Sequence, residues 1–447
     1  MERVLFSGGS VVTAEGVSRV DVAISNGKIS EIGDNLPTAG ARVIDAADCY
    51  VMPGGVDART RITQAFNGRQ TPEEQRELWR TASVAAACGG TTCIVEAPAE
   101  VPHCDVSVPE VAAGNSAVDY TVYSVATPEG DIPPGGVPAL CPMSGERALD
   151  DAALLRALHT LRNSGGLAHV RCANNAMLAW CRRQLQEAKA CDVRHIPAAY
   201  PTLNEEEGVW RLMALAQTAG AAVSVVNLST ASTAFMVRMA RAHGHKIFAE
   251  TCPQYLLLDA SCYEEGVAEG LKYLTMPPLR AKTDRTGLWQ CLRDGHVDIV
   301  TSDHCGGSFA ARWEVSQGDI FASPLGLPGV ETRIPLIFSE GVLKGRVPLP
   351  RFVEIMATRP ADMLGLPHKG RIAVGADADI MVLNPQEARD VTAQLLHQGT
   401  DYTPYEGMKV RGWPQHVFLR GQQLVDNYAF VGESVSGQQC TVTPLEW

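Results

Sequence analysis

The residues whose types and spacing could do chemistry stand at the ends of short apolar runs. Two arginines, Arg59 and Arg61, follow the run that ends in Pro53-Gly54-Gly55-Val56-Asp57, and Asp303 and His304 follow another. A guanidinium stays protonated at ordinary pH and has no lone pair to give, so an arginine cannot ligate a divalent cation. A zinc centre needs several histidines and carboxylates that converge. Only Asp303 and its neighbour His304 offer such ligand atoms here.

Two interpretations of the arginines stay open. In the first, Arg59, Arg61 and a third arginine, Arg171, are structural. They form ion pairs with Asp57, Asp303 or nearby acids and fill a former cavity. In the second, the guanidiniums hold a small carboxylate, phosphate or ureido acid through forked hydrogen bonds. Guanidiniums within ~6 Å of one another repel by about 3 kcal/mol per pair at an effective dielectric near 20, so an anionic group must compensate them.

Eight short apolar runs of β type alternate with longer segments of helical periodicity, a pattern typical of parallel βα units. The runs are Tyr50–Gly54, Thr91–Glu96, Tyr120–Ser124, Pro138–Met143, Leu167–Cys172, Ala222–Leu228, Lys246–Cys252 and Val297–Ser302. Apolar spacing predicts helices that include Glu73–Ala87, Asp150–Asn163, Asn174–Ala190, Glu205–Gly220 and Ser232–His243. Eight such repeats predict a (β/α)8 barrel over residues 51–370, with its chemistry at the carboxyl ends of the strands.

The two ends of the chain carry a different pattern. Short β-type segments fill the first 50 residues, with the hairpin signal Asn26-Gly27 between two of them, and similar segments return after residue 370. We expect strands at Arg3–Phe6, Val11–Thr13, Val20–Ser25, Lys28–Ile32, Asp377–Leu383, His416–Leu419 and Gln423–Val425. The two pieces predict one small β-sandwich domain, residues 1–50 and 371–447, beside the barrel.

Composition limits the class of protein. The 447 residues, 45% of them hydrophobic, are enough for one large and one small domain. The 38 basic and 50 acidic residues give a net charge of −12, which argues against nucleic acid or an anionic membrane as partner. The first residues lack a basic segment followed by an apolar run, and no apolar stretch has membrane-spanning length. We therefore expect a cytoplasmic protein.

The 13 cysteines are scattered and include no Cys-x-x-Cys pair. Cys104, Cys252, Cys291 and Cys305 are candidate nucleophiles. A buried thiol that packs as a small apolar side chain is the interpretation that we favour for each of them.

Motifs along nearly the whole chain resemble one enzyme family, the hydantoinases and dihydropyrimidinases of the amidohydrolase superfamily, which open cyclic amides. The motifs are Pro53-Gly54-Gly55-Val56-Asp57, Gly89-Gly90-Thr91-Thr92, Glu250-Thr251-Cys252-Pro253-Gln254-Tyr255-Leu256-Leu257-Leu258-Asp259, Pro277-Pro278-Leu279-Arg280, Ser302-Asp303-His304-Cys305, Gly326-Leu327-Pro328-Gly329-Val330-Glu331 and Gly375-Ala376-Asp377-Ala378-Asp379. The resemblance implies a TIM-like barrel, a β-sandwich domain and a dinuclear metal centre at the strand ends.

This sequence departs from the family at the metal ligands that the resemblance implies. The family's four histidine positions carry Arg59, Arg61, Arg171 and Asn227, and its carbamylated lysine position carries Leu140. The loss of the lysine does not depend on the alignment, because no lysine occurs from Ile29 through Ala188. Of the implied ligands only Asp303 remains, which in the family also handles the proton of the attacking water. We therefore expect no zinc at this centre.

Positions that the resemblance assigns to substrate recognition differ as well. The positions where the family has a tyrosine, a serine and an asparagine carry Gly145, Met276 and Leu325 in this sequence. The polar groups that would bind a cyclic diamide are thus apolar or absent. Losing ligands and specificity groups together suggests that the original reaction has been abandoned.

Other histidines offer weak alternatives as ligands. His169 would reach the ligand position of Arg171 only through a shift of two residues, which breaks the match at Gly165-Gly166-Leu167. His243 and His245 form a His-x-His pair, but they precede a strand, at the end of a barrel opposite to the chemistry.

Three classes of function remain open. The first is a non-catalytic homologue that acts as an oligomer subunit, either with itself as a dimer or tetramer or with an active homologue or a transcarbamylase-type partner. The second is an active cyclic-amide hydrolase that opens hydantoin, dihydropyrimidine or related ureide rings, with Asp303 as base. The third is a protein that binds a small anionic or ureido ligand without turnover. The resemblance also implies that Asp401–Gly407 contributes to packing between protomers.

Overall fold

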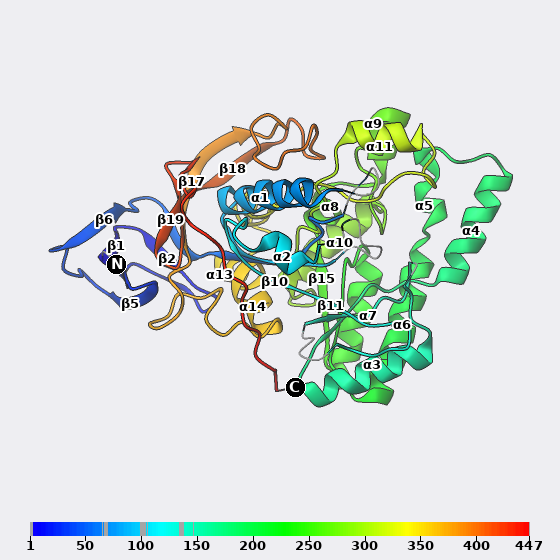
Figure 1. Cartoon of the computed structure of the whole chain (residues 1–447), viewed down its shortest axis with the longest axis horizontal. Coiled ribbons are helices and arrows are strands. Elements are labelled where there is room, and N and C mark those ends of the chain that lie inside the picture. Colours follow the sequence, from blue (N-terminus) through cyan, green and yellow to red (C-terminus); the bar gives the residue numbers. More distant parts are fainter. Residues whose placement is uncertain are drawn as a thin grey trace.

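The computed structural model describes residues 3–64, 66, 70–98, 104, 106–133, 138–145 and 147–446. Figure 1 shows a barrel wrapped by helices and, on its left, a smaller β domain formed from the blue N-terminal and orange to red C-terminal segments. Two segments that are far apart in the sequence therefore build one domain beside the barrel.

The barrel consists of parallel strands in sequence order. They are β8 (Gly55–Thr60), β9 (Thr91–Glu96), β10 (Asp119–Val122) continued by β11 (Ser124–Val125), β12 (Ala139–Leu140), β13 (Ala168–Val170), β14 (Val223–Val225), β15 (Ile247–Thr251) and β16 (Ile299–Val300). A parallel bridge between Thr60 and His304 joins the last strand position to the first and closes the barrel. All carboxyl ends therefore meet at one mouth.

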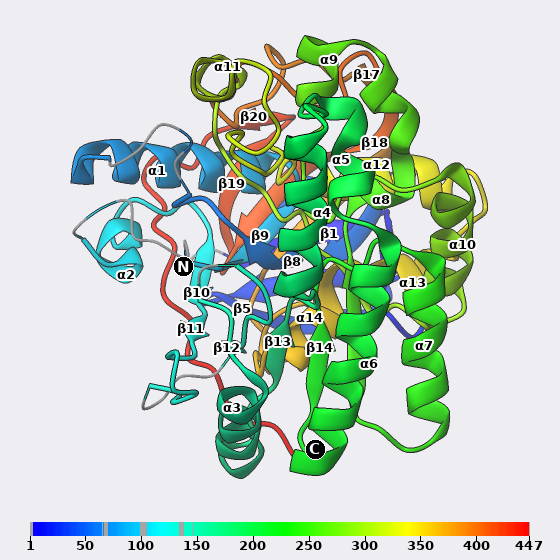
Figure 2. The same ribbon diagram turned by 90° about the vertical axis from the view of Figure 1, so that its right-hand side faces the viewer.

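Helices follow the strands and cover the outside of the barrel (Figure 2). They are α1 (Pro72–Cys88), α2 (Val108–Ala112), α3 (Asp151–Ser164), α4 (Asn175–Glu187), α5 (Ile196–Ala199), α6 (Thr202–Ala219), α7 (Ala231–Ala242), α8 (Pro253–Leu257), α9 (Val267–Leu271), α10 (Lys282–Arg293), α11 (Phe309–Ser316), α12 (Arg333–Ile337), α13 (Leu349–Val353) and α14 (Arg359–Met363). In α3 the buried Leu154, Leu158 and Leu161 recur at helical spacing, so one apolar face packs on the barrel.

Two sheets form the smaller domain. The four-stranded sheet has the order β5 (Lys28–Gly33), β4 (Asp21–Ser25), β1 (Arg3–Ser7), β6 (Ala41–Asp45). The seven-stranded sheet has the order β20 (Ala429–Phe430), β19 (Gln422–Asp426), β18 (Lys409–Leu419), β17 (Ile380–Asp390), β7 (Tyr50–Pro53), β2 (Ser10–Val12), β3 (Val17–Ser18). Phe6 and Phe418 meet edge to face between the sheets, 5.0 Å apart. The predicted sandwich is thus seen, while its exact domain boundaries stay a prediction.

The expectation that the run Tyr50–Gly54 forms the first barrel strand is wrong. Residues Tyr50–Pro53 form β7, which pairs with β17 and β2 of the sandwich. The first barrel strand is β8, immediately after Gly54. A Cβ at Gly54 would lie 2.2 Å from Thr92 Oγ1, so only glycine allows the chain to pass from one sheet to the other here.

The C-terminal segment after β20 returns from the sandwich to the barrel, as the red trace in Figures 1 and 2 shows. The backbone N–H of Cys440 donates to Tyr120 O at 2.7 Å, and that of Leu445 donates to Gly165 O at 2.8 Å. The segment therefore binds along the barrel wall by backbone hydrogen bonds.

A buried charge cluster joins the two domains. Lys369 Nζ contacts Asp379 Oδ2 at 2.8 Å and Asp377 Oδ2 at 2.9 Å, and it also contacts Asp119 on β10. Arg420, between β18 and β19, pairs with Asp119 as well. Burial lowers the pKa of Lys369, but the aspartates outweigh it and hold the pKa well above its usual range. The motif Gly375–Asp379 thus has a structural role.

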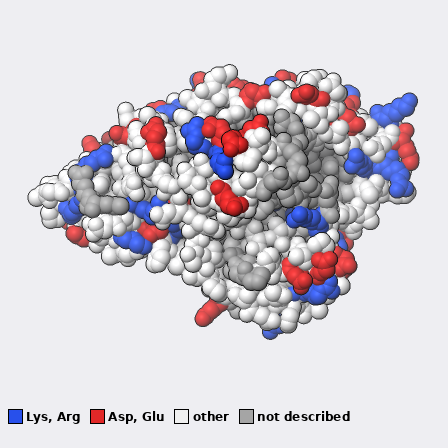
Figure 3. Space-filling model, in the orientation of Figure 1, with Lys and Arg blue, Asp and Glu red and all other residues white. Residues whose placement is uncertain are grey.

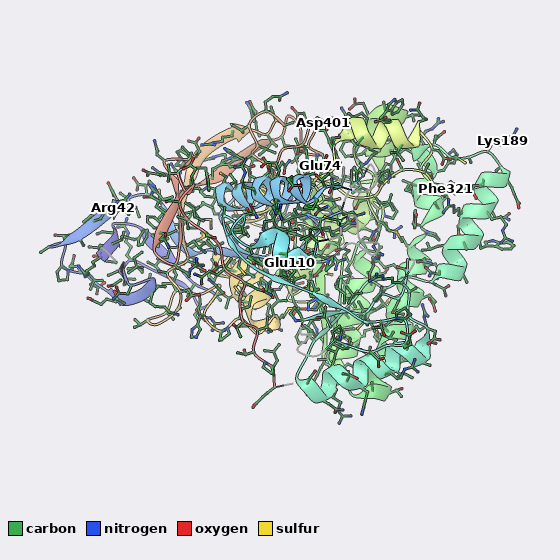
Figure 4. All side chains as sticks on the ribbon, in the orientation of Figure 1. Arg42, Glu74, Glu110, Lys189, Phe321 and Asp401 are labelled. Carbon is green, nitrogen blue, oxygen red and sulfur yellow. The ribbon has the colours of Figure 1, made fainter. Side chains whose placement is uncertain are left out.

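Helix starts are fixed by local acceptors. Thr71 and Glu74 form a reciprocal capping box at the start of α1. Asp401 accepts from the first two N–H groups of α11, at 2.6 and 3.1 Å (Figure 4 labels Glu74 and Asp401).

Tyr405 is buried in an apolar cluster of the same chain. The segment Asp401–Gly407 therefore makes contacts within its own protomer, and a role between protomers stays a prediction.

The surface carries both signs of charge, interspersed over the face that Figure 3 shows. Among the described residues, no helix combines the length and the apolar character that crossing a membrane requires.

Candidate functional site

Asp303 is the centre of a charge cluster at the mouth of the barrel. Its Oδ1 accepts from Arg59 Nε at 3.1 Å and lies 2.9 Å from Arg61 Nε, and its Oδ2 accepts from Arg61 Nη2 at 3.2 Å. Asn227 Nδ2, from the turn after β14, also donates to Oδ2 at 2.9 Å. The structure thus brings together four residues named from the sequence, Arg59, Arg61, Asn227 and Asp303.

Two of these residues hold an uncommon backbone conformation. Asn227 has φ 56° and Asp303 has φ 48°, in the left-handed region that asparagine and aspartate tolerate best among residues with a Cβ. Asp303 N donates to Arg59 O at 3.1 Å, and Arg61 N donates to His304 O at 2.7 Å. These bonds fix the turn at Asp303 against β8, and the Asn227 side chain meets the Asp303 carboxylate there.

Leu140 and Arg171, the other two positions named from the sequence, lie in different surroundings. Leu140 ends β12 and packs against an apolar cluster that includes Ala58 and Tyr123. Arg171 follows β13 and is half-buried. Burial raises the pKa of Tyr200, and the charge of Arg171 is among those that oppose this rise. Arg171 therefore lies within electrostatic reach of Tyr200.

Asp57 does not pair with the mouth arginines as the structural interpretation expected. Its Oδ2 lies 3.6 Å from Nε of the buried Arg333, and its Oδ1 accepts from the backbone N–H of Ser302 at 3.0 Å. Burial raises the pKa of Asp57, although Arg333 opposes this. Asp57 thus ties the first strand to the last, and Asp303 is left to balance Arg59 and Arg61.

Glu250 is a site residue to which the sequence analysis gave no role. It lies on β15, and its Oε1 is 4.0 Å from Arg59 Nε and accepts from Thr301 Oγ1 at 3.3 Å. Burial raises its pKa to about 8, with Asp303 and Asp57 adding to the rise and Arg59 opposing it. At neutral pH this carboxyl is mostly protonated. Its position near the end of a predicted strand was the signal that could have identified it.

Polar atoms without partners remain in this buried cluster. Among the described residues, Arg59 Nη1 and Glu250 Oε2 have no hydrogen-bond partner, although Arg59 is only 6% exposed and Glu250 is fully buried. Burial lowers the pKa of Arg59, but the charge of the neighbouring Asp303 carboxylate outweighs burial and raises it. Arg59 therefore stays charged, and the Nη1 group of its guanidinium has no hydrogen-bond acceptor among the described residues. An open buried donor of this kind is costly unless something binds it.

Two buried histidines flank the cluster. Burial and the charge of Arg59 lower the pKa of His169 to about 3, and burial and Arg61 do the same for His304. His304 Nδ1 accepts from Gly329 N at 3.1 Å, so its proton is on Nε2. His169 Nδ1 lies 3.3 Å from the Tyr123 hydroxyl, which itself donates to a backbone oxygen, so His169 Nε2 carries a lone pair. Both imidazoles are neutral.

Three of the cysteines considered as nucleophiles are buried. Burial raises the pKa of Cys252 and of Cys305, and it raises the pKa of Cys291 to about 11. A protonated thiol is a weak nucleophile, so these cysteines act as packing residues.

The raised pKa of Glu250 predicts a pH-dependent stability. Between pH 4.5 and about 8 the native state holds a proton that the unfolded state has released. The free energy of unfolding therefore falls as pH rises, by up to ~1.4 kcal/mol per pH unit from this group. Glu250→Gln removes the titration, so we expect the variant to gain stability relative to wild type from about pH 5 to about pH 8. Urea unfolding at both pH values measures this gain.

The matched control is Glu433→Gln at an exposed position. If Glu250→Gln shows the same pH dependence as Glu433→Gln and wild type, Glu250 is ionised normally in the folded protein and the assignment is wrong.

The barrel, the flanking sandwich and the polar residues at the strand ends define an amidohydrolase-type protein. The chain belongs to the amidohydrolase family, whose model matches residues 50–424. It is 36% identical over 454 residues to the D-hydantoinase of Ralstonia pickettii, covering 97% of this chain and 98% of that protein. It is 35% identical over 454 residues to the D-phenylhydantoinase of Escherichia coli O9:H4 (strain HS), with 98% and 97% covered.

Solved structures agree with this assignment. The dihydropyrimidinase from Brevibacillus agri NCHU1002 superposes with a TM-score of 0.92 at 32% identity over 100% of both chains. The D-hydantoinase from Bacillus sp. AR9 gives 0.91 at 34% identity, over 99% of this chain and 100% of that one. The predicted (β/α)8 fold and the resemblance to hydantoinases and dihydropyrimidinases are confirmed.

Proposed function

We propose that this protein binds a small ureido or carboxylate compound at the barrel mouth through Arg59 and Arg61. One observation carries the proposal: two buried guanidiniums converge on one carboxylate, that of Asp303, and Nη1 of Arg59 still has no partner among the described residues. Glu250, the other nearby carboxyl, is mostly protonated at neutral pH. The cluster thus has one positive charge in excess and an open donor for an anionic ligand.

The donor set does not fit a pair of divalent metal ions. Guanidinium groups and a leucine stand where the family resemblance implies imidazoles and a bridging carbamate, and Asp303 is already bonded by two arginines. His169 Nε2 is one open lone pair, and His304 carries its proton on the corresponding atom. One imidazole and one engaged carboxylate are too few for a dinuclear centre.

The comparisons favour the second function left open by the sequence, a ring-opening hydrolase, over a non-catalytic homologue. The reported relatives are named hydantoinases or dihydropyrimidinases and match at least 97% of this chain. In that reaction a water oxygen bonds to the ring carbonyl carbon, the C–N bond breaks, the nitrogen takes a proton, and a ureido carboxylate results. Arg59 and Arg61 suit the carboxylate of this product, and Glu250 above about pH 8 is a candidate base. Both candidate functions therefore share one ligand class.

Titration calorimetry tests the shared proposal. Wild-type protein is titrated with N-carbamoylglycine, hydantoin, dihydrouracil and inorganic phosphate. Because Nη1 of Arg59 is the open donor, we expect Arg59→Gln to weaken the binding of the carboxylate ligand by at least about tenfold, the cost of one charge-assisted hydrogen bond. Arg42→Gln, an exposed position of the sandwich domain, is the control and should bind as wild type does. Flat isotherms for every ligand would refute binding at the mouth.

We also propose that the protein forms a homo-oligomer, a dimer or tetramer. Large apolar side chains are exposed on α4, α6 and α7, among them Trp180 (62%), Trp210 (51%) and Met239 (53%). Trp210 and Met239 line the same hollow on the neighbouring helices α6 and α7, and an exposed apolar patch of this kind is typical of an interface. Sedimentation velocity should give a dimer or larger species, and Trp210→Glu should shift it toward monomer. A wild-type monomer at micromolar concentration would contradict this. Association with an active homologue stays a prediction.

A further inference from the structure

A second cluster of ligand-type side chains lies where helix α1 ends. Cys88 is the last residue of α1, Glu331 ends the loop that precedes α12, and His397 lies in the segment between β17 and β18. One ligand atom from each of the three side chains lies within 4.8 Å of the others. Within the described part of the chain, this is the one group of three such side chains that meets so closely.

The three side chains are held in place by their surroundings. Glu331 is 2% exposed and Cys88 is 6% exposed. Glu331 Oε1 lies 2.9 Å from His397 Nδ1, and Oε2 accepts from the backbone N–H of His397 at 2.6 Å. The His397 side chain is 41% exposed, so the cluster is buried on two sides and reachable from solvent on the third.

The end of α1 favours a cation at this point. The carboxyl end of a helix carries partial negative charge, and the last turn of α1 has no basic residue. A Cβ on Gly89 would lie 2.3 Å from Glu331 O, so glycine lets the backbone of Glu331 approach the helix end. This contact fixes Glu331 beside Cys88.

We propose that Cys88, Glu331 and His397 form a zinc-binding site, with water as the fourth ligand on the exposed side. Sulfur, imidazole nitrogen and carboxylate oxygen are the three donor types that Zn²⁺ takes in proteins. Binding would release two protons to solvent, that of the Cys88 thiol and the one that His397 shares with Glu331, so that sulfur, imidazole nitrogen and carboxylate oxygen are all free to coordinate. The neighbouring charge of Arg389 opposes a cation, but Arg389 is itself paired with Glu387 at 3.0 Å.

Zinc at this site would stiffen one wall of the barrel mouth. The loop that ends at Glu331 also carries Gly329 and Val330, whose N–H groups face His304 Nδ1 at 3.1 and 3.4 Å. His304 is the direct neighbour of Asp303. The ion would therefore join α1, this loop and the segment of His397, and it would act on the mouth only through the loop.

The test is zinc binding by the full chain. Purified protein is dialysed against zinc chloride, and bound zinc per chain is counted by plasma mass spectrometry for wild type, Cys88→Ser and His397→Ala. We expect each variant to lose one zinc per chain, with affinity at least about tenfold weaker, since removing even an outer partner of a metal ligand has that cost. Cys262→Ser, a partly exposed cysteine elsewhere, is the control and should keep its zinc.

A second readout is independent of how the Cys88 variant folds. Cobalt added to wild-type protein should give a thiolate-to-cobalt charge-transfer band, and His397→Ala, at a half-exposed position, should lose it. Retention of the zinc by either variant, or a cobalt spectrum without a thiolate band, overturns the site. A zinc count that neither substitution lowers would place the metal elsewhere in the chain and would overturn this proposal.

Discussion

Replacing Asp303 with alanine should destabilise the protein by about 3 to 5 kcal/mol, the range for breaking a buried ion pair by removing one partner. Asp303 has 1% of its side chain exposed, and the Arg59 and Arg61 side chains have 7% and 12%. Without the carboxylate, two charged guanidiniums would remain buried against each other with no firmly ionised partner. Urea unfolding followed by circular dichroism measures the change.

The matched controls separate charge from packing. Asp151→Ala removes one half of an exposed pair with Arg211 and should cost less than ~1 kcal/mol. The triple variant Arg59→Met, Arg61→Met, Asp303→Asn removes all three charges, keeps a residue that tolerates the left-handed backbone at position 303, and should cost less than Asp303→Ala alone, because no charge is left unpaired. An Asp303→Ala variant that is as stable as Asp151→Ala would show that the arginines do not depend on this carboxylate.

The sequence predicted most of the barrel because the alternation of apolar β runs and amphipathic helices has a clear period. The first strand was placed wrongly for a physical reason. Val51 and Met52 are as apolar as a barrel strand, but the glycine pair Gly54-Gly55 lets the chain leave one sheet and enter another within a single residue. Periodicity cannot detect such a transfer.

The elements that the sequence analysis missed have weak side-chain patterns. Strand β6 (Ala41–Asp45) has one buried residue in five, so its apolar content gave no signal. The C-terminal segment binds the barrel through backbone hydrogen bonds, which leave no trace in side-chain type. Both are held by tertiary contacts rather than by local preference.

At the site, the rule that chemistry lies at strand ends located Arg59, Arg61 and Asp303, and the family resemblance added Asn227. The structure brings all four together at the Asp303 carboxylate, whereas Leu140 packs in an apolar cluster. The rule does not predict which acidic residue forms an ion pair with each arginine. Asp57 pairs with Arg333, a residue far away in the sequence, because both are buried between the first and last strands. Pairing of this kind is decided by burial, which the sequence does not display.

The second prediction with a large expected effect concerns turnover, and it tests the proposal that the mouth with Arg59 and Arg61 binds an anionic ligand and no divalent metal. A zinc centre lowers the pKa of its bound water from near 16 to about 7. Without it, ring opening loses the activated water that the reaction needs at neutral pH. Adding zinc or a chelator should therefore leave the rate unchanged.

The most direct measurement is a ring-opening assay with hydantoin and dihydrouracil on protein purified in the presence of zinc. It is run with and without a chelator, and bound metal is counted on the Cys88→Ser, His397→Ala double variant so that the count reports on the barrel mouth. We predict no metal at the mouth and no turnover that depends on metal. Near-stoichiometric zinc in the double variant, with turnover that the chelator abolishes, would contradict the account and identify a metal-dependent hydrolase.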